Sequence, residues 1–380
     1  MKSSNNKKQL LTGNEAAAEA AILAGCRYYY GYPITPQNEL VNHMAIRMPQ
    51  VGGTFLQAES EIAAIYMAYG SAAAGARVMT SSSSPGISLM QEGISYLAGS
   101  ELPCVIVNMQ RGGPGLGDIS PSQADYFQAV KGGGHGDYRT IVLAPASVQE
   151  IADLVYDAFD LADRYRNPVM LLGDAQLGQM MEPVELKKIP RTQQTPRWAV
   201  TGAEGRARNI IKSFYPVKGE LEAFNIRLQR KYKVVEQKEV RYEEVNTERA
   251  EIILVAYGTC ARICKEALRR ISGTGLQIGL LRPISLWPFP KEPLRRLAKK
   301  AKAFCVVEMS SGQMLEDVKL AVLNRCPVHF YGRMGGGVPS SKEVIKKVLN
   351  ILAPEESTLE LEMSEISQEL GKGLYFSTIP

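Results

Sequence analysis

The sequence predicts an α/β protein built from two doubly wound open sheets. Its 380 residues exceed the length of one typical domain. Short apolar runs alternate with helical patterns in two separate stretches, and a basic, polar stretch divides them. The composition, with 45% hydrophobic and 22% charged residues, is ordinary for a soluble globular protein.

The first stretch contains the clearer alternation of strands and helices. Its near-continuous apolar strands are typical of a parallel sheet covered on both faces. Gly25 ends the first helix and Ser147 begins the last one, as helix-terminating and capping residues do. Strands are predicted at 27–30, 55–57, 78–81, 104–108, 141–144 and 168–172. Helices are predicted at 14–24, 37–48, 61–74, 87–98 and 148–162.

The alternation stops near residue 183 and resumes near residue 252. The intervening stretch has weak periodicity, with a helix expected over 220–234. Afterwards, strands are predicted at 252–256, 277–281, 303–307 and 328–331, and helices at 260–271, 294–302 and 313–323. We therefore expect a first domain at 1–185, a connecting segment at 186–248, a second domain at 249–352 and a C-terminal tail at 353–380.

Charge is distributed unevenly between the halves. Residues 1–185 hold 11 Lys and Arg against 18 Asp and Glu, whereas the remainder holds 33 against 21. The basic half either meets acidic ligands and partners or is simply a solvated surface. No nucleic-acid-binding motif is present.

No segment of the sequence predicts membrane insertion or secretion. The longest apolar stretch, 62–76, is interrupted by Gly70 and Ser71. Glu15 and Glu19 interrupt the N-terminal stretch that a signal peptide would need. We expect a cytoplasmic protein that does not bind membranes.

The six cysteines, at 26, 104, 260, 264, 305 and 326, have no spacing typical of zinc or iron–sulfur sites. They are expected to be reduced, mostly buried thiols. No metal site is predicted in this chain, so any iron–sulfur cluster would belong to another chain.

Three unusual loops follow predicted strands, at 31–36, 81–86 and 110–117. Ligands bind beyond the carboxyl ends of strands in open parallel sheets. A fourth glycine-rich loop, 132–137, precedes a strand instead. Glycine lets the backbone approach a ligand closely, although flexible turns account for most glycine clusters.

Two acids, Glu59 and Glu61, stand at the start of an otherwise small and apolar helix. The helix dipole favours a carboxylate there and accounts for one of them. The other is expected to face a buried partner. A carboxylate in a dry pocket that hydrogen-bonds a ring nitrogen promotes proton transfer.

Arg111 is the only charged residue between Glu101 and Asp118. It ends a buried strand and begins a glycine-rich loop. A bidentate contact with a substrate carboxylate suits this position. A structural ion pair with a nearby acid is the alternative.

Five motifs occur in a characteristic order. They are Gly31-Tyr-Pro-Ile-Thr-Pro36, Gln57-Ala-Glu-Ser-Glu-Ile-Ala-Ala64, Thr80-Ser-Ser-Ser-Ser-Pro-Gly86, Gln110-Arg-Gly-Gly-Pro-Gly115 and Gly134-His-Gly-Asp137. Together they resemble the α-type, pyrimidine-binding subunit of 2-oxoacid:ferredoxin oxidoreductases. Pro283-Ile-Ser-Leu-Trp-Pro-Phe-Pro290 and Val307-Glu-Met-Ser-Ser-Gly-Gln313 resemble the second, transketolase-C-terminal-like domain of that family. The resemblance covers the chain except 190–248 and the tail after 353.

The resemblance implies roles for individual residues. Glu61 matches the glutamate that bonds N1′ of the thiamine aminopyrimidine, and Glu59 lies close enough to be confused with it. Thr35 and Arg111 match residues at the substrate carboxylate. The motifs also imply cofactor contacts for a set of loop residues, namely Tyr32, Pro33, Ser83 and Ser84. His135 and Asp137 are further candidates, and His135 either lines the pocket or satisfies a turn.

The resemblance also implies partners. A thiamine diphosphate site needs a magnesium-binding Gly-Asp-Gly followed by an Asn, and Gly173-Asp174-Ala175 matches only in part. The chain should therefore share thiamine diphosphate with a β subunit that holds the diphosphate and Mg²⁺. [4Fe-4S] clusters would belong to that subunit or to γ or ferredoxin-like δ subunits, in a dimer of hetero-oligomers. Coenzyme A would accept the acyl group, and ferredoxin the electrons.

The substrate remains open between two classes. The amino-acid sequence of 86–128 most resembles the branched-chain (2-oxoisovalerate) type, and the 2-oxoglutarate type is the next most similar. A transketolase-like subunit without electron transfer and a non-catalytic scaffold are the other functions that fit the motifs.

Overall fold

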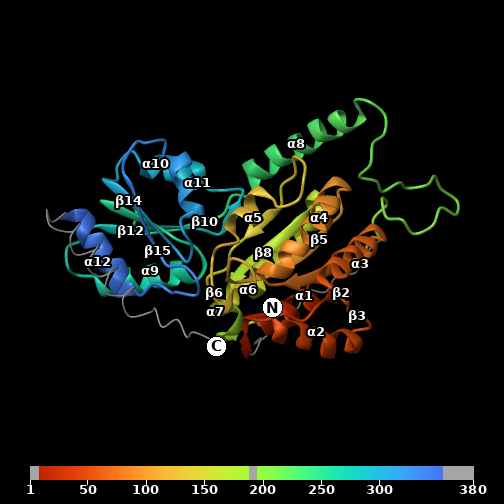
Figure 1. Cartoon of the computed structure of the whole chain (residues 1–380), viewed down its shortest axis with the longest axis horizontal. Coiled ribbons are helices and arrows are strands. Elements are labelled where there is room, and N and C mark those ends of the chain that lie inside the picture. The colour runs from red at the N-terminus through yellow and green to blue at the C-terminus, as the bar shows by residue number, and fades with distance from the viewer. Residues whose placement is uncertain (1–7, 188–194, 354–380) are drawn as a thin grey trace, which may run out of the picture.

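The computed structural model describes residues 8–187 and 195–353, which form two α/β units side by side (Figure 1). This confirms the predicted fold class. The larger unit contains an eight-stranded sheet and the smaller one a five-stranded sheet. The predicted tail at 353–380 lies, apart from its first residue, outside the described residues, as does part of the connecting segment.

The first sheet has the strand order β13-β7-β8-β5-β4-β2-β3, and β6 pairs with β5 at its side. The neighbouring strands β7, β8, β5, β4, β2 and β3 run parallel, and β4 and β5 are buried along their whole length. The strands are β2 (Tyr28–Gly31), β3 (Thr54–Gln57), β4 (Val78–Ser82), β5 (Cys104–Gly112), β6 (Asp118–Pro121), β7 (Ile141–Leu143), β8 (Pro168–Asp174) and β13 (Ser285–Trp287).

The helices of this unit form two packed groups. Helix α1 packs against α2 and α6, and α3 packs against α4. A separate antiparallel pair, β1 (Gln9–Thr12) with β9 (Met181–Val184), packs beside α1 and α6. The helices are α1 (Gly13–Leu23), α2 (Asn38–Gln50), α3 (Glu61–Ala73), α4 (Ser84–Gly99), α5 (Tyr126–Lys131), α6 (Val148–Tyr165) and α7 (Ala175–Gln179).

The second sheet has the order β10-β12-β11-β14-β15, and only β10 is antiparallel. Helix α8 (Glu220–Lys238) extends along the first unit toward it, as the green helix of Figure 1 shows. The strands are β10 (Tyr242–Val245), β11 (Ile252–Val255), β12 (Ile278–Pro283), β14 (Ala303–Glu308) and β15 (Val328–Gly332). The helices are α9 (Gly258–Arg270), α10 (Lys291–Leu297), α11 (Gln313–Val322) and α12 (Ser341–Leu352).

Two differences from the sequence-based expectation affect the site. Helix α4 begins at Ser84 rather than at residue 87, because Ser83 is extended and Pro85 suits the first helical turn. Strand β5 continues to Gly112, and its last two residues, Arg111 and Gly112, pair with β6. The predicted loop 81–86 therefore includes the start of α4, and the predicted loop 110–117 includes the end of β5.

The two units are joined through a strand as well as through side chains. Strand β13 follows β12 of the second sheet, yet it pairs antiparallel with β7 of the first sheet. No helix of the described residues is long and apolar enough to cross a membrane.

Candidate functional site

The three loops singled out in the sequence meet at one edge of the first sheet. They follow β2, β4 and β5, which are neighbours in the order β5-β4-β2. Helix α3, which begins at Glu61, follows the next strand, β3. The carboxyl edge of a parallel sheet thus brings together residues 31–36, 61, 82–86 and 111.

Glu61 is the central residue of this edge. Ser60 caps α3 by accepting a hydrogen bond from Ala63 N (3.2 Å), which fixes the first turn. The Glu61 side chain is only 5% exposed, and its Oε1 accepts a hydrogen bond from Ser82 Oγ (3.2 Å). A Cβ on Gly86 would lie 2.2 Å from the same oxygen. The carboxylate is therefore held between the end of β4 and the first turn of α4, where only glycine fits.

Glu59 behaves differently from Glu61. It lies on the exposed loop before α3, whereas Glu61 points into the protein. The two acids are only two residues apart in the sequence, but one side chain is exposed and the other is buried.

Arg111 lies across the same edge and is 6% exposed. Its guanidinium donates to two backbone carbonyls, those of Thr35 (3.0 Å) and Leu116 (2.9 Å), and Nε has no partner. Within the described residues no carboxylate lies in ion-pair range of Arg111, so the alternative of a structural ion pair is not supported there. A buried guanidinium whose partners are all neutral oxygen atoms, the Thr35 hydroxyl (3.4 Å) included, is suited to an anionic ligand.

Other buried polar atoms of this edge also lack partners. Ser83 Oγ and Asn108 Oδ1 accompany Arg111 Nε in this respect. Leaving such atoms unsatisfied costs free energy, and each one needs an explanation. A polar ligand at this edge supplies one.

The remaining predicted cofactor contacts are placed unequally. Tyr32, Pro33 and Thr35 are exposed on the loop after β2, next to Arg111. The Ser84 hydroxyl is already engaged, because it donates to Asp125 Oδ2 (2.6 Å) and accepts from Arg111 N (3.0 Å).

His135 and Asp137 lie elsewhere. The carbonyl of His135 accepts from Ser95 Oγ (2.8 Å), and Ser95 stands eleven residues along α4 from Ser84. That separation is about 16 Å along a helix. With residues of α4 and α8 they line a separate cavity of about 160 Å³. The structure does not bring them to Glu61.

Two residues of the site were missed from the sequence, Asn108 and Asp125. Asp125 Oδ2 accepts from Ser84 Oγ and from Asn108 Nδ2 (2.9 Å), and burial raises the pKa of this carboxyl. No motif or glycine cluster contains Asp125, so no local signal marks it. Ser82, by contrast, lay within a loop already singled out.

Asp174, the acid of the partial Gly-Asp motif, has a structural role. It caps α7 by accepting from Leu177 N (3.1 Å), and it accepts from Thr259 Oγ1 of the second unit (2.8 Å). Across the described part of the chain, no group of three or more His, Cys, Asp or Glu side chains is placed to hold a metal ion.

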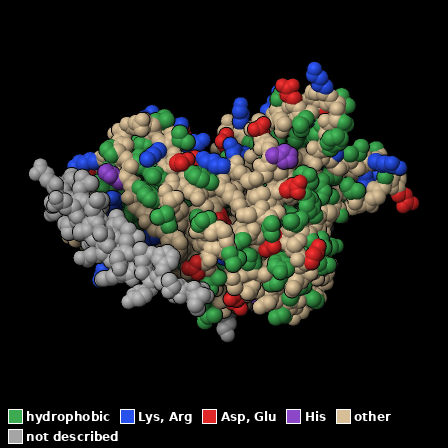
Figure 2. Space-filling model, viewed as in Figure 1, with side chains coloured by type: hydrophobic (Ala, Val, Ile, Leu, Met, Phe, Trp, Pro, Cys, Tyr) green, Lys and Arg blue, Asp and Glu red, His purple; other side chains and the backbone are tan. Residues whose placement is uncertain are grey.

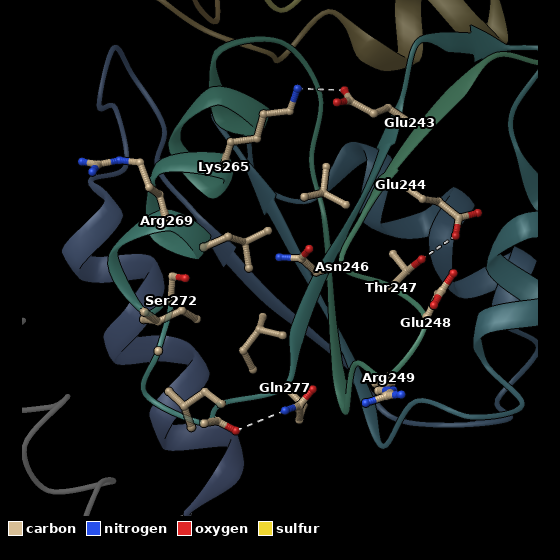
Figure 3. A pocket seen from close by; sticks show the side chains of 17 residues that line it. Glu243, Glu244, Asn246, Thr247, Glu248, Arg249, Lys265, Arg269, Ser272 and Gln277 are labelled. Atoms are coloured by element: carbon tan, nitrogen blue, oxygen red, sulfur yellow. Dashed lines mark hydrogen bonds and ion pairs between the residues drawn. The ribbon is translucent and has the colours of Figure 1, made fainter.

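A large cavity lies away from these residues, in the second unit. Figure 3 shows this space of about 1320 Å³ beside β10 and α9, at the amino ends of β11 and β12. Two pairs of its labelled side chains bond to each other, Lys265 with Glu243 (2.8 Å) and Thr247 with Glu244 (2.5 Å). None of its lining residues has a buried side-chain nitrogen or oxygen without a partner. Volume alone therefore does not identify the site.

Comparison with known families identifies the family of the chain. Residues 19–250 match the thiamine diphosphate-binding family of pyruvate flavodoxin/ferredoxin oxidoreductases. Residues 250–344 match core domain II of pyruvate:ferredoxin oxidoreductase. The chain therefore belongs to the 2-oxoacid:ferredoxin oxidoreductase family, whose members are thiamine diphosphate-dependent enzymes. The family and enzyme class predicted from the motifs are confirmed.

Individual relatives narrow the resemblance. The chain is 53% identical to the ketoisovalerate oxidoreductase subunit VorB of Methanothermobacter marburgensis, over 90% of this chain and 97% of that one. It is 39% identical to the 2-oxoglutarate synthase subunit KorA of Archaeoglobus fulgidus, over 82% of this chain and 90% of that one.

A solved structure shows the same fold. It is the 2-oxoglutarate:ferredoxin oxidoreductase of Magnetococcus marinus with 2-oxoglutarate, coenzyme A and succinyl-CoA bound. The superposition has a TM-score of 0.82 at 26% identity and covers 91% of this chain. The chain spans 65% of the length of that neighbour.

Proposed function

We propose that this chain forms the pyrimidine side of a shared thiamine diphosphate site in an enzyme that oxidatively decarboxylates a branched-chain 2-oxoacid to acyl-CoA. Glu61 would bond N1′ of the aminopyrimidine, and Arg111 would hold the carboxylate of the substrate. The observation that carries the proposal is the buried Glu61 carboxylate beside Gly86, at an edge with unpaired polar atoms.

The residues of the edge fit the cofactor. A buried carboxylate bonded by one hydroxyl keeps acceptor capacity for a protonated ring nitrogen. Ser83 Oγ offers a further unpaired polar atom. Exposed Tyr32 and Pro33 offer apolar surface for a flat ring. When bound, the cofactor supplies the electron sink into which the substrate loses CO₂.

Each residue of the chain would then have a limited task. Glu61 holds and moves the proton at N1′, because its carboxylate is fixed by Ser82 and by the close approach of α4. Arg111 orients the substrate through a charge-assisted contact, with Thr35 beside it. Glu59, His135 and Asp137 receive no role at this site.

A partner subunit would close the site. Large apolar side chains surround the edge and remain exposed, and Leu116, next to Arg111, is 82% exposed. The others are Tyr32, Leu56, Ile62, Leu89 and Ile119. Figure 2 shows hydrophobic side chains gathered over the face that α3 and α4 occupy. Apolar surface of this kind marks protein–protein contact.

We assign the diphosphate, Mg²⁺ and the [4Fe-4S] clusters to such partners. A β subunit would bind at this face, and γ or δ subunits and ferredoxin would complete electron transfer in a dimer of hetero-oligomers. The cysteines of the chain are free thiols, five of them buried, which suits a reduced cytoplasmic enzyme.

The substrate assignment has two supports. The relative at 53% identity is named for ketoisovalerate, and the relative at 39% for 2-oxoglutarate. The β5–β6 hairpin that holds Arg111 also carries two exposed apolar residues, Leu116 and Ile119. Apolar neighbours suit a branched aliphatic side chain, whereas 2-oxoglutarate needs a second cation.

The test is a charge-neutral variant in the assembled complex. Glu61→Gln should abolish 2-oxoacid-dependent reduction of a low-potential acceptor while leaving assembly intact. The matched control is Glu59→Gln, which should keep full turnover because Glu59 is exposed. Normal turnover in the Glu61 variant would reject the proposal.

Rates with 2-oxoisovalerate, 2-oxoglutarate and pyruvate then decide the substrate. The highest kcat/KM is expected for 2-oxoisovalerate. A preference for 2-oxoglutarate would overturn the branched-chain assignment and leave the role of Glu61 intact.

A further inference from the structure

Asp125 lies in the segment 122–127, which touches both the catalytic edge and the second unit. It stands at the residue before α5, yet its side chain does not cap that helix. Its carboxylate instead points to the edge of the first sheet, where Oδ2 accepts from Ser84 Oγ (2.6 Å) and Asn108 Nδ2 (2.9 Å). Its backbone N–H donates to Gln110 Oε1 (3.1 Å). One residue thus joins the start of α4 to the end of β5.

The turn that Asp125 holds is the one that touches both proposed functional residues. Ser84 Oγ accepts from Arg111 N, and Gly86, two residues later, packs against the Glu61 carboxylate. A shift of this turn would therefore move the wall of Glu61 and the backbone of Arg111 together.

Asp125 is itself positioned by the second unit. Gln123 exchanges hydrogen bonds with Met309, which follows β14: Gln123 N donates to Met309 O (2.9 Å), and Met309 N to Gln123 Oε1 (3.0 Å). Its Nε2 also donates to Tyr257 O (2.9 Å), after β11.

A second glutamine, Gln313, holds the same segment from its other side, and we call Gln123 and Gln313 together the clamp. Gln313, at the start of α11, donates to Ala124 O (2.7 Å) and accepts from Phe127 N (2.8 Å). The residues on both sides of Asp125 are therefore bonded to the second unit, and the placement of Asp125 depends on it.

We propose that Asp125 is a positioning residue: clamped by Gln123 and Gln313, it holds the Ser84–Gly86 turn and thereby sets Glu61 and Arg111 for the reaction. The inference rests on the proposed roles of Glu61 and Arg111. It gives the second unit a task in catalysis without any residue of that unit at the site. Misplacement of a reacting group by about 1 Å costs on the order of a hundredfold in rate.

The experiment compares Asp125→Ala with Asp125→Asn in the complete complex loaded with thiamine diphosphate. Alanine removes both hydrogen bonds, whereas the amide oxygen of asparagine can still accept from Ser84 and Asn108. The readouts are kcat, KM and the rate at which the C2 hydrogen of bound thiamine diphosphate exchanges with deuterium. Asp125→Ala should lower kcat/KM about a hundredfold and the exchange rate about tenfold, with recovery in Asp125→Asn.

Tyr126→Phe is the matched control. Tyr126 is adjacent to Asp125 and its hydroxyl donates to Asp317 of the second unit (2.8 Å), but it does not touch Ser84. The variant removes a neighbouring contact between the units and leaves the hydrogen bonds of Gln123 and Gln313 in place. It should leave the exchange rate and kcat/KM within about twofold of the parent, as a structural role predicts.

A double-mutant cycle separates action through Ser84 from other effects. If Asp125 acts through Ser84, the variant carrying Ser84→Ala and Asp125→Ala loses no more activity than the worse single variant. Additive losses would overturn the inference. So would an assembled Asp125→Ala complex with parental exchange and kcat/KM. If Asp125→Ala does not assemble, Ser84→Ala decides, since an unchanged exchange rate there rejects the inference.

Failure of the inference differs from failure of the proposed function. An inactive Glu61→Gln complex with a normal Asp125→Ala complex rejects only the positioning role. A normal Glu61→Gln complex rejects the proposed function on which the inference rests.

Discussion

The two parallel sheets of this chain use their carboxyl edges in different ways. At the first sheet, the residues after β4 and at the end of β5 leave Ser83 Oγ and Arg111 Nε buried without partners. At the second sheet, the residues after β11 and β14 are bonded to Gln123, and Thr259 is bonded to Asp174. The same architecture thus keeps one edge available for ligands and uses the other to hold the first unit.

A buried acid at each edge shows the same contrast. Glu61 accepts one hydrogen bond, from Ser82. Glu308, at the end of β14, accepts from Met314 N, Leu315 N and Ser310 Oγ, and so begins α11. Unpaired polar groups, rather than cavity volume, therefore set apart the edge at which we propose that the ligand binds.

Among the variants that compare the two edges, the largest effect is expected from removing the buried cation Arg111. Arg111→Ala should lower kcat/KM for the 2-oxoacid by about a thousandfold, mainly through KM, because a buried charge-assisted contact is lost. Steady-state kinetics of the complete complex measure this. The control is Arg249→Ala, at the large cavity of the second unit, which should change nothing. Equal losses in both variants would break the contrast between the edges.

Gly86→Ala should reduce kcat about a hundredfold, because its Cβ would meet the Glu61 carboxylate at 2.2 Å and displace it. Turnover at saturating substrate is the measurement. Gly99→Ala, at the other end of α4, is the control, since its Cβ would meet Ser213 Cβ at an ordinary 3.4 Å. Full activity of the Gly86 variant would contradict the close approach of α4 to Glu61.

The second edge should respond in stability rather than in catalysis. Thr259→Val removes a donor from buried Asp174 without changing shape, so the free energy of unfolding should fall by about 2 kcal/mol. Denaturant unfolding measures this, with exposed Thr274→Val as a control expected within about 0.5 kcal/mol of the parent. A loss of activity per assembled complex, without a loss of stability, would show that this edge also serves the reaction directly.

The smallest effect is expected away from both edges, on the outer helices α1 and α2. Burial opposes the charge of Glu19, but hydrogen bonds from His43 and Arg47 lower its pKa to about 2. A lowered pKa adds stability above about pH 4.5, and this stability is lost as pH falls toward about 2. Glu19→Gln should therefore cost about 1–2 kcal/mol at pH 7, after allowance for the partly exposed partners.

Acid titration of the unfolding free energy tests this. The difference between the parent and the Glu19 variant should shrink between pH 4.5 and 2. A constant difference would mean that the carboxylate contributes by packing and not by charge.

Local sequence was sufficient for the parallel strands and for most of the longer helices, but it missed α12 and several short elements, and it marked the candidate residues Glu61 and Arg111. Continuous apolar runs encode strands buried on both faces, so the parallel strands were found close to their observed bounds. Gly and Pro marked the loops after β2, β4 and β5. A pair of acids leading an apolar helix marked Glu59 and Glu61 together, and an isolated cation at the end of a strand marked Arg111. Each of these signals lies within a few residues of the chain.

Contacts between distant segments needed the folded structure. The separation of Glu59 from Glu61, the distance of His135 and Asp137 from the site, and the pairing of β13 with the first sheet follow from strand order and helix packing. Asp125 meets Ser84 across 41 residues, and Gln123 meets Met309 across 186. Periodicity reports which face of an element is buried, but not which other element covers it. The physical reason is that burial is a property of each segment, whereas a hydrogen bond between segments depends on how the whole chain packs.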